Sequence, residues 1–129
     1  HNVINTKLYE YKDLYAMLER MPSNEGRSLT FKVKKEFHQQ FKVKFEHYFS
    51  DYYDLYSKDD FLKLGFLGDI NKYGYNQRLD DFLGDFIAIA SNELYLEYVD
   101  FKDDAFHFKS AHAGITKNEM ETPLIIIKK

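Results

Sequence analysis

Cysteine is absent from this chain of 129 residues, and its absence excludes three kinds of chemistry. There can be no disulfide framework, no thiolate metal site and no cysteine nucleophile. Because chains without disulfides are typical of reducing compartments, we expect a cytoplasmic protein. Apolar runs are also short. The longest, such as Pro123 to Ile127, have the length of a strand, whereas a membrane-spanning helix needs about 20 apolar residues. We therefore expect no membrane partner.

The motifs of a complete small enzyme are missing too. The 6 glycines are scattered, so no glycine-rich loop can surround a phosphate group. There is no Gly-x-Ser-x-Gly elbow to present a serine nucleophile. No two histidines have the His-Glu-x-x-His spacing of a zinc site. A self-sufficient catalytic domain is therefore the weakest hypothesis. Because the first residue is His1 and not Met, we expect an excised piece of a longer protein with a leftover tag histidine.

An excess of positive charge is lacking as well. The net charge is -3 and the pI is near 5.9, which argues against nucleic acid as the main partner because phosphate binding depends on a basic surface. The lysines between positions 32 and 44 form the densest basic cluster, but Glu36, Glu46 and Asp51 lie among and just beyond them. This mixture indicates a solvated helix face.

Large aromatic rings are abundant, with 12 Phe and 11 Tyr. Most of these rings must be buried, because exposed ones would form adhesive patches. Together with 44% hydrophobic and 30% charged residues, they indicate a globular protein with an aromatic-rich single core.

Hydrophobic periodicity predicts alternating helices and strands. The predicted helices cover residues 6–20, 34–50, a segment capped by Ser57 and ended by Gly65, one turn over 78–83, and a short turn opened by the capping box of Thr116 and Glu119. The predicted strands cover residues 28–33, 52–56, 86–90 and 94–98, a return strand with Phe106 and Phe108 after a turn at Asp103 and Asp104, and a last buried strand over 124–127. This order predicts an α+β fold in which two to three helices pack on a small mixed sheet.

Histidines and acidic residues are the candidates for chemistry. His38, His47 and His107 fall on polar positions and are expected to face solvent. His112 follows a predicted strand and is flanked by Ala111, Ala113 and Gly114, which leave room for a metal or phosphate. It is either a metal ligand or an ordinary loop histidine. Three acidic residues around Gly84 either share a metal or proton, or form a polar loop: Asp80, Asp81 and Asp85.

Two blocks of sequence resemble a known family. The stretch from Ser110 to Ile125, with its His, small residues, Glu-Met turn, Pro and apolar strand, is similar to the C-terminal signature of the alkaline phosphatase superfamily. It is most similar to the type I phosphodiesterase/nucleotide pyrophosphatase branch. Residues 64–68, Arg78 and residues 84–90 resemble the segment that precedes this signature. The first 60 residues match no motif.

The resemblance implies a single domain made of two parts. Residues 1–60 would be a cap or insertion beside an active site, and residues 61–129 would be the C-terminal part of a hydrolase-like domain. His112 would bind one of two divalent metals, usually zinc. The family's nucleophile and its other metal ligands precede this region, so the chain would be inactive alone. Ala113 departs from the pattern, because the residue after the histidine is commonly Gly.

Two functions therefore remain open. The first is the C-terminal portion of a metal-dependent phosphoric ester hydrolase, whose partners would be the remainder of the parent chain and a phosphorylated small-molecule substrate. The second is a freestanding aromatic-rich binding domain without catalysis.

Overall fold

An antiparallel sheet of four strands forms the centre of the computed structural model, which describes residues 3–100 and 109–127. Its strands lie in the order β2-β3-β5-β4. Their bounds are Ser23–Glu25 for β2, Ser28–Phe31 for β3, Tyr53–Ser57 for β4 and Phe86–Ala90 for β5. A separate parallel pair joins β1 (Ile4–Lys7) to β6 (Leu94–Glu97). Strands from residues 1–60 and from residues 61–129, the two expected parts of the chain, thus share one sheet.

The strand β5 occupies the interior of this sheet, as its continuous apolar sequence predicts. All five of its residues are buried, and it pairs with β3 on one side and β4 on the other. Ala88 lies opposite Leu29 of β3 and Leu55 of β4. Other side chains must therefore pack against both faces of β5.

The larger part of the core covers one face of the sheet through α2 (His38–Phe49), which follows a 3-10 turn over Lys35–Phe37. Phe41, Phe45 and Phe49 recur every four residues and are all buried, so they form one stripe on the helix. The ring of Phe31 on β3 lies 5.1 Å from that of Phe41 and 5.4 Å from that of Phe45, measured between ring centroids. These tilted and edge-on aromatic pairs confirm the predicted aromatic core.

A smaller cluster covers the opposite face, because Ile87 and Ile89 alternate with the other β5 side chains. Phe61 of α3 (Lys58–Lys63) and Leu83 of α5 (Arg78–Leu83) pack on these two isoleucines. The α+β class is confirmed, and the sheet divides the core into two clusters.

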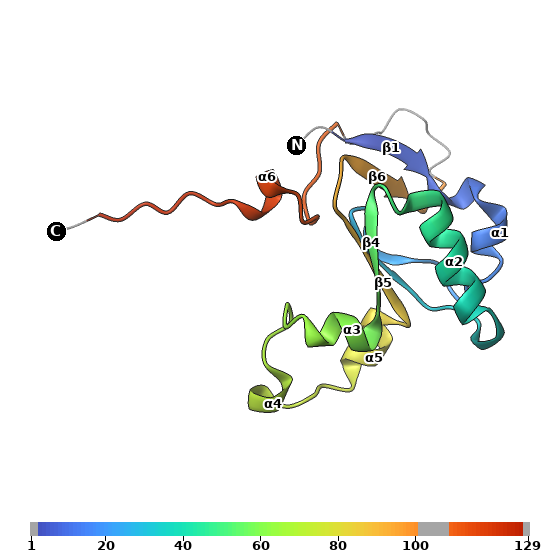
Figure 1. The fold of residues 1–129 in the computed structure, drawn as a ribbon, viewed down its shortest axis with the longest axis horizontal. Helices are drawn as coiled ribbons and strands as arrows, with labels where there is room; N and C mark the ends of the chain where they lie inside the picture. Colours follow the sequence, from blue (N-terminus) through green and yellow to red (C-terminus); the bar gives the residue numbers. More distant parts are fainter. Residues whose placement is uncertain (1–2, 101–108, 128–129) are drawn as a thin grey trace.

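Residues 58–83 form a lobe that we call the α3–α5 lobe, seen below the sheet in Figure 1. Ser57 accepts a hydrogen bond from the Asp60 amide, which confirms the predicted cap of α3. Between α3 and α5 lies a short helix that the sequence did not predict, α4 (Ile70–Tyr73), and the Asp69 side chain caps it.

The prediction of one helix over residues 6–20 is wrong. This segment forms β1, a 3-10 turn over Leu8–Glu10 and the short helix α1 (Lys12–Tyr15), and Leu18 then makes a β-bridge with Val33. The pairing of β1 with β6 and the bridge at Leu18 supply tertiary hydrogen bonds that a local helical pattern does not reveal.

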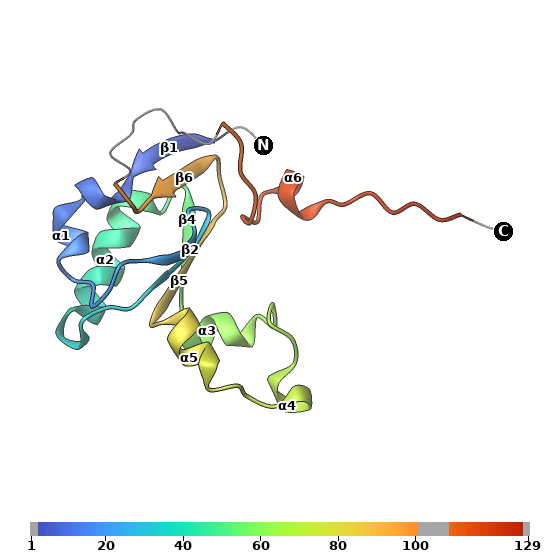
Figure 2. The same ribbon diagram turned by 180° about the vertical axis from the view of Figure 1, so that it is seen from behind.

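The prediction of a buried strand over residues 124–127 is also wrong for this chain. After α6 (Lys117–Met120), residues 121–127 extend away from the body as a segment that we call the C-terminal arm (Figures 1 and 2). Its four apolar side chains are 74% to 86% exposed. A strand needs a neighbour for its backbone groups, and no described strand lies beside the arm.

The predicted turn at Asp103 and return strand with Phe106 lie outside the described residues, as do His1 and His107. Within the described ranges, none of the helices is both long and apolar enough to cross a bilayer.

Candidate functional site

The loop that carries His112, residues 110–116, is attached to the end of the central strand. The Ile115 amide donates a hydrogen bond of 2.8 Å to the carbonyl oxygen of Ala90, the last residue of β5. Ala113 has φ of 77°. This left-handed backbone is unfavourable for a residue with a Cβ atom. The loop therefore has a defined and strained backbone, which is hydrogen-bonded to the end of β5 and leads into α6.

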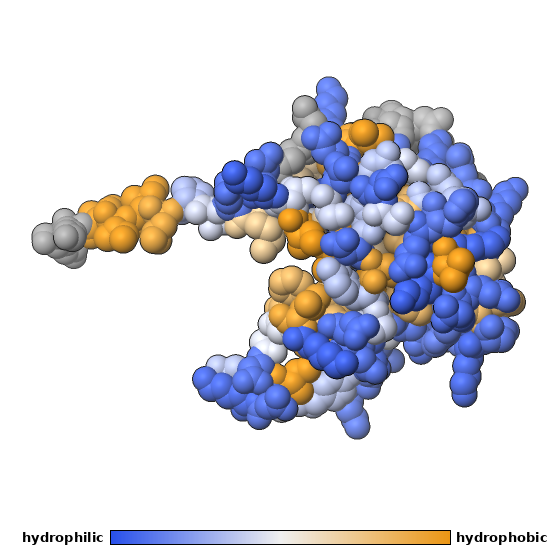
Figure 3. Space-filling view, in the orientation of Figure 1, coloured by the Kyte–Doolittle hydropathy of each residue, from blue (hydrophilic) through white to orange (hydrophobic). Residues whose placement is uncertain are grey.

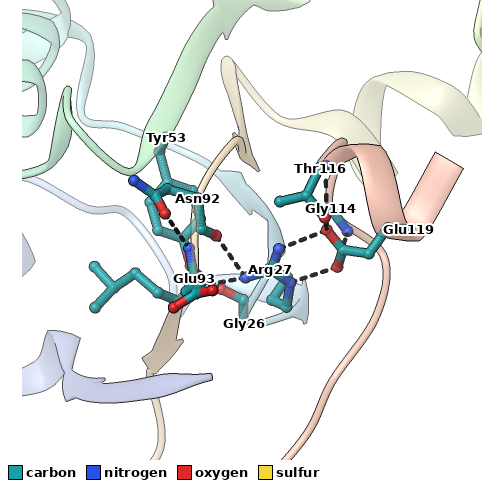
Figure 4. Close-up of polar contacts among 9 residues, drawn as sticks. Gly26, Arg27, Tyr53, Asn92, Glu93, Gly114, Thr116 and Glu119 are labelled. Atoms are coloured by element: carbon teal, nitrogen blue, oxygen red, sulfur yellow. Dashed lines mark hydrogen bonds and ion pairs between the residues drawn. The ribbon is translucent and has the colours of Figure 1, made fainter. Parts of the chain in front are cut away.

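A buried ion pair fixes α6, the helix that follows this loop (Figure 4). Arg27 donates two hydrogen bonds of 2.6 Å to Glu119, from Nε to Oε1 and from Nη2 to Oε2. Both side chains are only 2% exposed. The remaining terminal nitrogen of Arg27 donates to the carbonyl oxygens of Asn92 and Leu94, at 2.8 and 2.9 Å. This Arg27–Glu119 clamp joins α6 to the turn between β2 and β3.

The carboxylate of Glu119 also organises the loop itself. It accepts hydrogen bonds from the amides of Gly114 and Thr116 and from the Thr116 hydroxyl. The predicted capping box is therefore confirmed. Burial alone would raise the pKa of Glu119, but hydrogen bonds from Arg27, Thr116 and Gly114 outweigh it and lower the pKa to about 2. The clamp is thus ionised at neutral pH.

Gly114 is needed where the loop passes over the clamp. A Cβ atom at this position would lie 2.6 Å from Arg27 Nη2, 2.6 Å from Glu119 Oε2 and 2.7 Å from the carbonyl oxygen of Ala90. Two of these atoms belong to the clamp and the third to backbone, so none can move aside without breaking a hydrogen bond. Close approach, with no left-handed backbone involved, explains this glycine.

His112 itself is exposed at the surface. His112 lines a hollow of about 310 Å³, together with Asn24 and Glu25 of β2 and with Tyr95 and Tyr98. The Tyr98 hydroxyl donates a hydrogen bond of 2.6 Å to the carbonyl oxygen of Asn24, which braces one wall. Sequence reasoning missed Glu25 and the two tyrosines, because no motif links residues that only the fold brings together.

The described residues do not form a complete metal site. No group of three His, Cys, Asp or Glu side chains that could hold a metal occurs in residues 3–100 and 109–127. A catalytic zinc takes about three protein ligands. Of the described residues that line the hollow, His112 and Glu25 are those of these four types. The described part of this chain can therefore supply part of a metal site, and we derive no catalytic step from it.

The three acidic residues around Gly84 bind separate partners. Asp80 accepts hydrogen bonds of 2.5 Å from Lys58 Nζ and from the Tyr75 hydroxyl. These hydrogen bonds lower the pKa of Asp80, Lys58 contributing most. Asp81 engages Arg20 through its backbone oxygen. Among the described residues, these side chains are not part of any group of three possible metal ligands.

Asp85 ties the start of β5 to the start of α2. It accepts hydrogen bonds from the Val33 amide at 2.9 Å and from Lys32 Nζ at 3.1 Å. His38 Nε2 lies 3.4 Å from the same carboxylate, and the ring packs edge-on against Phe86. The expectation that His38 simply faces solvent is therefore only half right, since its side chain is 43% exposed. His47 is exposed, as predicted.

Comparison with protein-family models, with curated proteins and with solved structures found no match to this chain.

Proposed function

We propose that this chain is the C-terminal portion of a metal-dependent phosphoric ester hydrolase of the phosphodiesterase/nucleotide pyrophosphatase type. In this proposal His112 contributes one ligand to a divalent metal, with zinc as the first candidate, and the surface around it shapes the site of a phosphorylated small molecule. The remaining ligands and the nucleophile come from the rest of the parent chain. A cytoplasmic location remains a prediction that accompanies this proposal.

The observation that carries the proposal is the placement of His112. Its ring is exposed on a short loop whose C-terminal side is fixed, at Ile115 to the carbonyl oxygen of Ala90 and at Gly114 to Glu119 of the clamp. Just before the loop, the Lys109 carbonyl oxygen accepts a hydrogen bond of 3.3 Å from the Val3 amide. A metal ligand must be held in place while its nitrogen stays accessible. An ordinary loop histidine does not require such support.

The backbone at Ala113 also supports the proposal. The pattern that this loop resembles commonly has Gly after the histidine, and Ala113 has the positive φ that Gly adopts without strain. The loop thus has the conformation for which the family's usual residue is suited, although the residue differs. Ala113 differs from the usual Gly of the signature, but its positive φ is consistent with the same loop conformation.

The chemistry fits a contribution to a site rather than a whole site. A divalent metal bound there would polarise a phosphoryl oxygen and activate a nucleophile. The role of this chain is to hold the His112 imidazole and to line the neighbouring hollow with Glu25, Tyr95 and Tyr98.

The decisive experiment uses the intact parent protein with His112→Ala. We expect most of the hydrolysis of a p-nitrophenyl phosphodiester to be lost, together with bound zinc measured by elemental analysis, while the circular dichroism spectrum stays unchanged. His47→Ala is the matched control, because His47 is exposed on α2 and lines none of the described hollows. Near-normal turnover and zinc content in the His112 variant would show that this residue is an ordinary loop histidine.

A freestanding binding domain is the second candidate, and exposed rings on the α3–α5 lobe favour it. Phe66, Tyr73 and Phe82 are 53%, 74% and 50% exposed. Figure 3 shows apolar surface on this lobe facing the space below the C-terminal arm. A parent gene that encodes only these residues, in a protein without bound metal, would favour this function over the hydrolase.

A further inference from the structure

The hollow beside His112 has an acidic side chain in its wall and no basic one, as far as the structure describes it. Its described lining residues are Asn24, Glu25, Tyr95, Tyr98, Ser110, Ala111 and His112. Glu25 is exposed, and within the described ranges its carboxylate forms no hydrogen bond or ion pair. Because a phosphate group binds beside Arg or Lys, and neither occurs in this lining, a positively charged ligand suits the hollow better.

The phenol of Tyr95 lies in the same negative surroundings. Burial raises the pKa of Tyr95, a hydrogen bond with the Gly26 backbone lowers it, and the charge of Glu25 raises it again. The Glu97 carboxylate acts on the phenol in the same direction as Glu25. Two carboxylates therefore lie close enough to this wall to attract a cation in the hollow.

Contacts within the chain hold the walls of the hollow in place. The Tyr98 hydroxyl donates to the carbonyl oxygen of Asn24, and the Tyr98 carbonyl oxygen accepts a hydrogen bond from the Tyr15 hydroxyl. The ring of Tyr95 packs on Gly26, where a Cβ atom would lie 2.6 Å from Cε1 of the ring. Such a preformed hollow loses little conformational entropy when a ligand binds.

Backbone strain is concentrated at the same place. Among the described residues, a positive φ occurs at two residues other than glycine, Asn24 with 73° and Ala113 with 77°. Asn24 lines the hollow, and Ala113 directly follows His112, which lines it too. Residues held in sparsely populated backbone conformations cluster at binding and active sites. This strain supports a ligand site here independently of the charges.

The hydrogen-bonding groups of the hollow favour one class of cation. Besides the Glu25 carboxylate, the described lining offers hydroxyl, amide and imidazole groups that can accept hydrogen bonds. A primary ammonium group has three N–H donors for them, whereas a quaternary ammonium group has none. The tyrosines add the attraction of an aromatic ring for a cation. The volume of about 310 Å³ lies at the lower end of the range of small-molecule sites, roughly 300 to 1,000 Å³, so the ligand is small.

We propose that this hollow binds the primary ammonium group of a small organic molecule, with Glu25 as its counter-ion and Tyr95 and Tyr98 as its aromatic walls. The binding itself needs only the described residues of this chain. One further step rests on the proposed function: in the hydrolase, the amine would belong to the substrate, which would be a phosphoric ester of an amino alcohol.

Titration of the isotope-labelled chain with n-butylammonium chloride at neutral pH, followed by heteronuclear NMR, tests the proposal without the parent protein. We expect saturable shifts of the amide signals of Glu25, Tyr95, Tyr98 and His112. Glu25→Gln should weaken binding about fivefold, the upper end for a partly exposed ion pair. Glu93→Gln is the matched control and should bind like the unaltered chain, because Glu93 is exposed and lines a different hollow.

Two further ligands separate the alternatives. The alcohol n-butanol has the same carbon chain without the charge, and tetramethylammonium has the charge without N–H donors, so both should bind more weakly than n-butylammonium. Equal binding of n-butanol would mean apolar contact alone, and equal binding of tetramethylammonium would mean that hydrogen bonds play no part. Either result overturns the inference, as do unaltered affinity in Glu25→Gln and an absence of saturable shifts.

The outcomes also separate this inference from the hydrolase proposal. Amine binding by the chain, with a parent protein that hydrolyses no phosphoric ester, leaves the inference standing and overturns the proposed function. A parent protein that hydrolyses phosphoric esters, with a hollow that binds no amine, overturns the inference and leaves the proposed function standing.

Discussion

Arg27 and Glu119 are 92 residues apart in the sequence and form a buried, two-pronged ion pair between the β2–β3 turn and α6. Every hydrogen-bonding nitrogen of the guanidinium has a partner, because Nη1 binds the carbonyl oxygens of Asn92 and Leu94. A buried ion pair is tolerable only when its groups are satisfied in this way. The clamp therefore joins α6 to the body, alongside the hydrogen bond from the Ile115 amide to the Ala90 carbonyl oxygen.

The first prediction concerns removal of one half of the clamp. Glu119→Ala leaves the Arg27 charge buried without its partner, and we expect the free energy of unfolding to fall by about 3 to 5 kcal/mol. Urea denaturation followed by circular dichroism measures this loss. Glu121→Ala is the control, because its ion pair with Lys117 is exposed and should change stability by less than about 0.5 kcal/mol. Equal stability of the two variants would mean that the clamp does not anchor α6.

The second prediction is that the free energy of unfolding falls at acidic pH because Glu119 becomes protonated. Its pKa is about 2 in the folded chain, below its ordinary value of 4.5. The unfolded state therefore binds the proton more readily, so the stabilisation is fully present above about pH 4.5 and is lost as the pH falls toward 2.

Glu119→Gln should flatten the pH dependence of unfolding between these limits, because an amide does not titrate there. Asp13 also titrates in this window, since hydrogen bonds from Lys44 and Tyr48 lower its pKa to about 2. The comparison must therefore be made against Asp13→Asn as well. If the loss of stability at low pH disappears in Asp13→Asn but persists in Glu119→Gln, then Asp13 and not Glu119 is responsible, and the prediction is wrong.

The third prediction concerns the backbone strain beside His112. A left-handed residue with a Cβ atom costs about 1 to 2 kcal/mol, while Gly loses about 0.5 to 1 kcal/mol in chain entropy. Ala113→Gly should therefore raise the free energy of unfolding slightly, by about 0.5 to 1 kcal/mol. Ala111→Gly is the matched control and should be destabilising, because Ala111 has no positive φ. Destabilisation by both glycines would contradict the strained loop path.

The fourth prediction is that the free chain folds without a metal. The two apolar clusters supply its core, and the ranges that the structure describes contain no group of three possible ligands. Thermal melts with and without EDTA should coincide, and the free chain should not hydrolyse p-nitrophenyl phosphodiesters. A lower melting temperature in EDTA would reveal a structural metal site.

Local sequence patterns predicted a helix or strand correctly where the interactions that form it lie within a few residues. The stripe of Phe41, Phe45 and Phe49 predicted α2, the apolar run at 86–90 predicted the interior strand, and Thr116 with Glu119 predicted the cap of α6. In each case the decisive interactions join residues a few positions apart or depend on burial alone.

The features that the sequence did not predict depend on contacts between residues that are far apart in the chain. Residues 4–7 form a strand because β6 lies beside them, and β2 supplies one wall of the His112 hollow. Neither relationship has a local signature. The same reasoning applies to the arm, whose strand composition could not say whether this chain contains its neighbour.

The sequence by itself determined the α+β class, the aromatic core, the main caps and the position of His112 as the candidate ligand. Only the tertiary structure decided that Arg27 meets Glu119, that Glu25 and two tyrosines flank His112, and that the last apolar run remains exposed. The physical reason is that propensity and periodicity act over a few residues, whereas ion pairs, hollows and strand pairing require chain segments that the fold alone brings together.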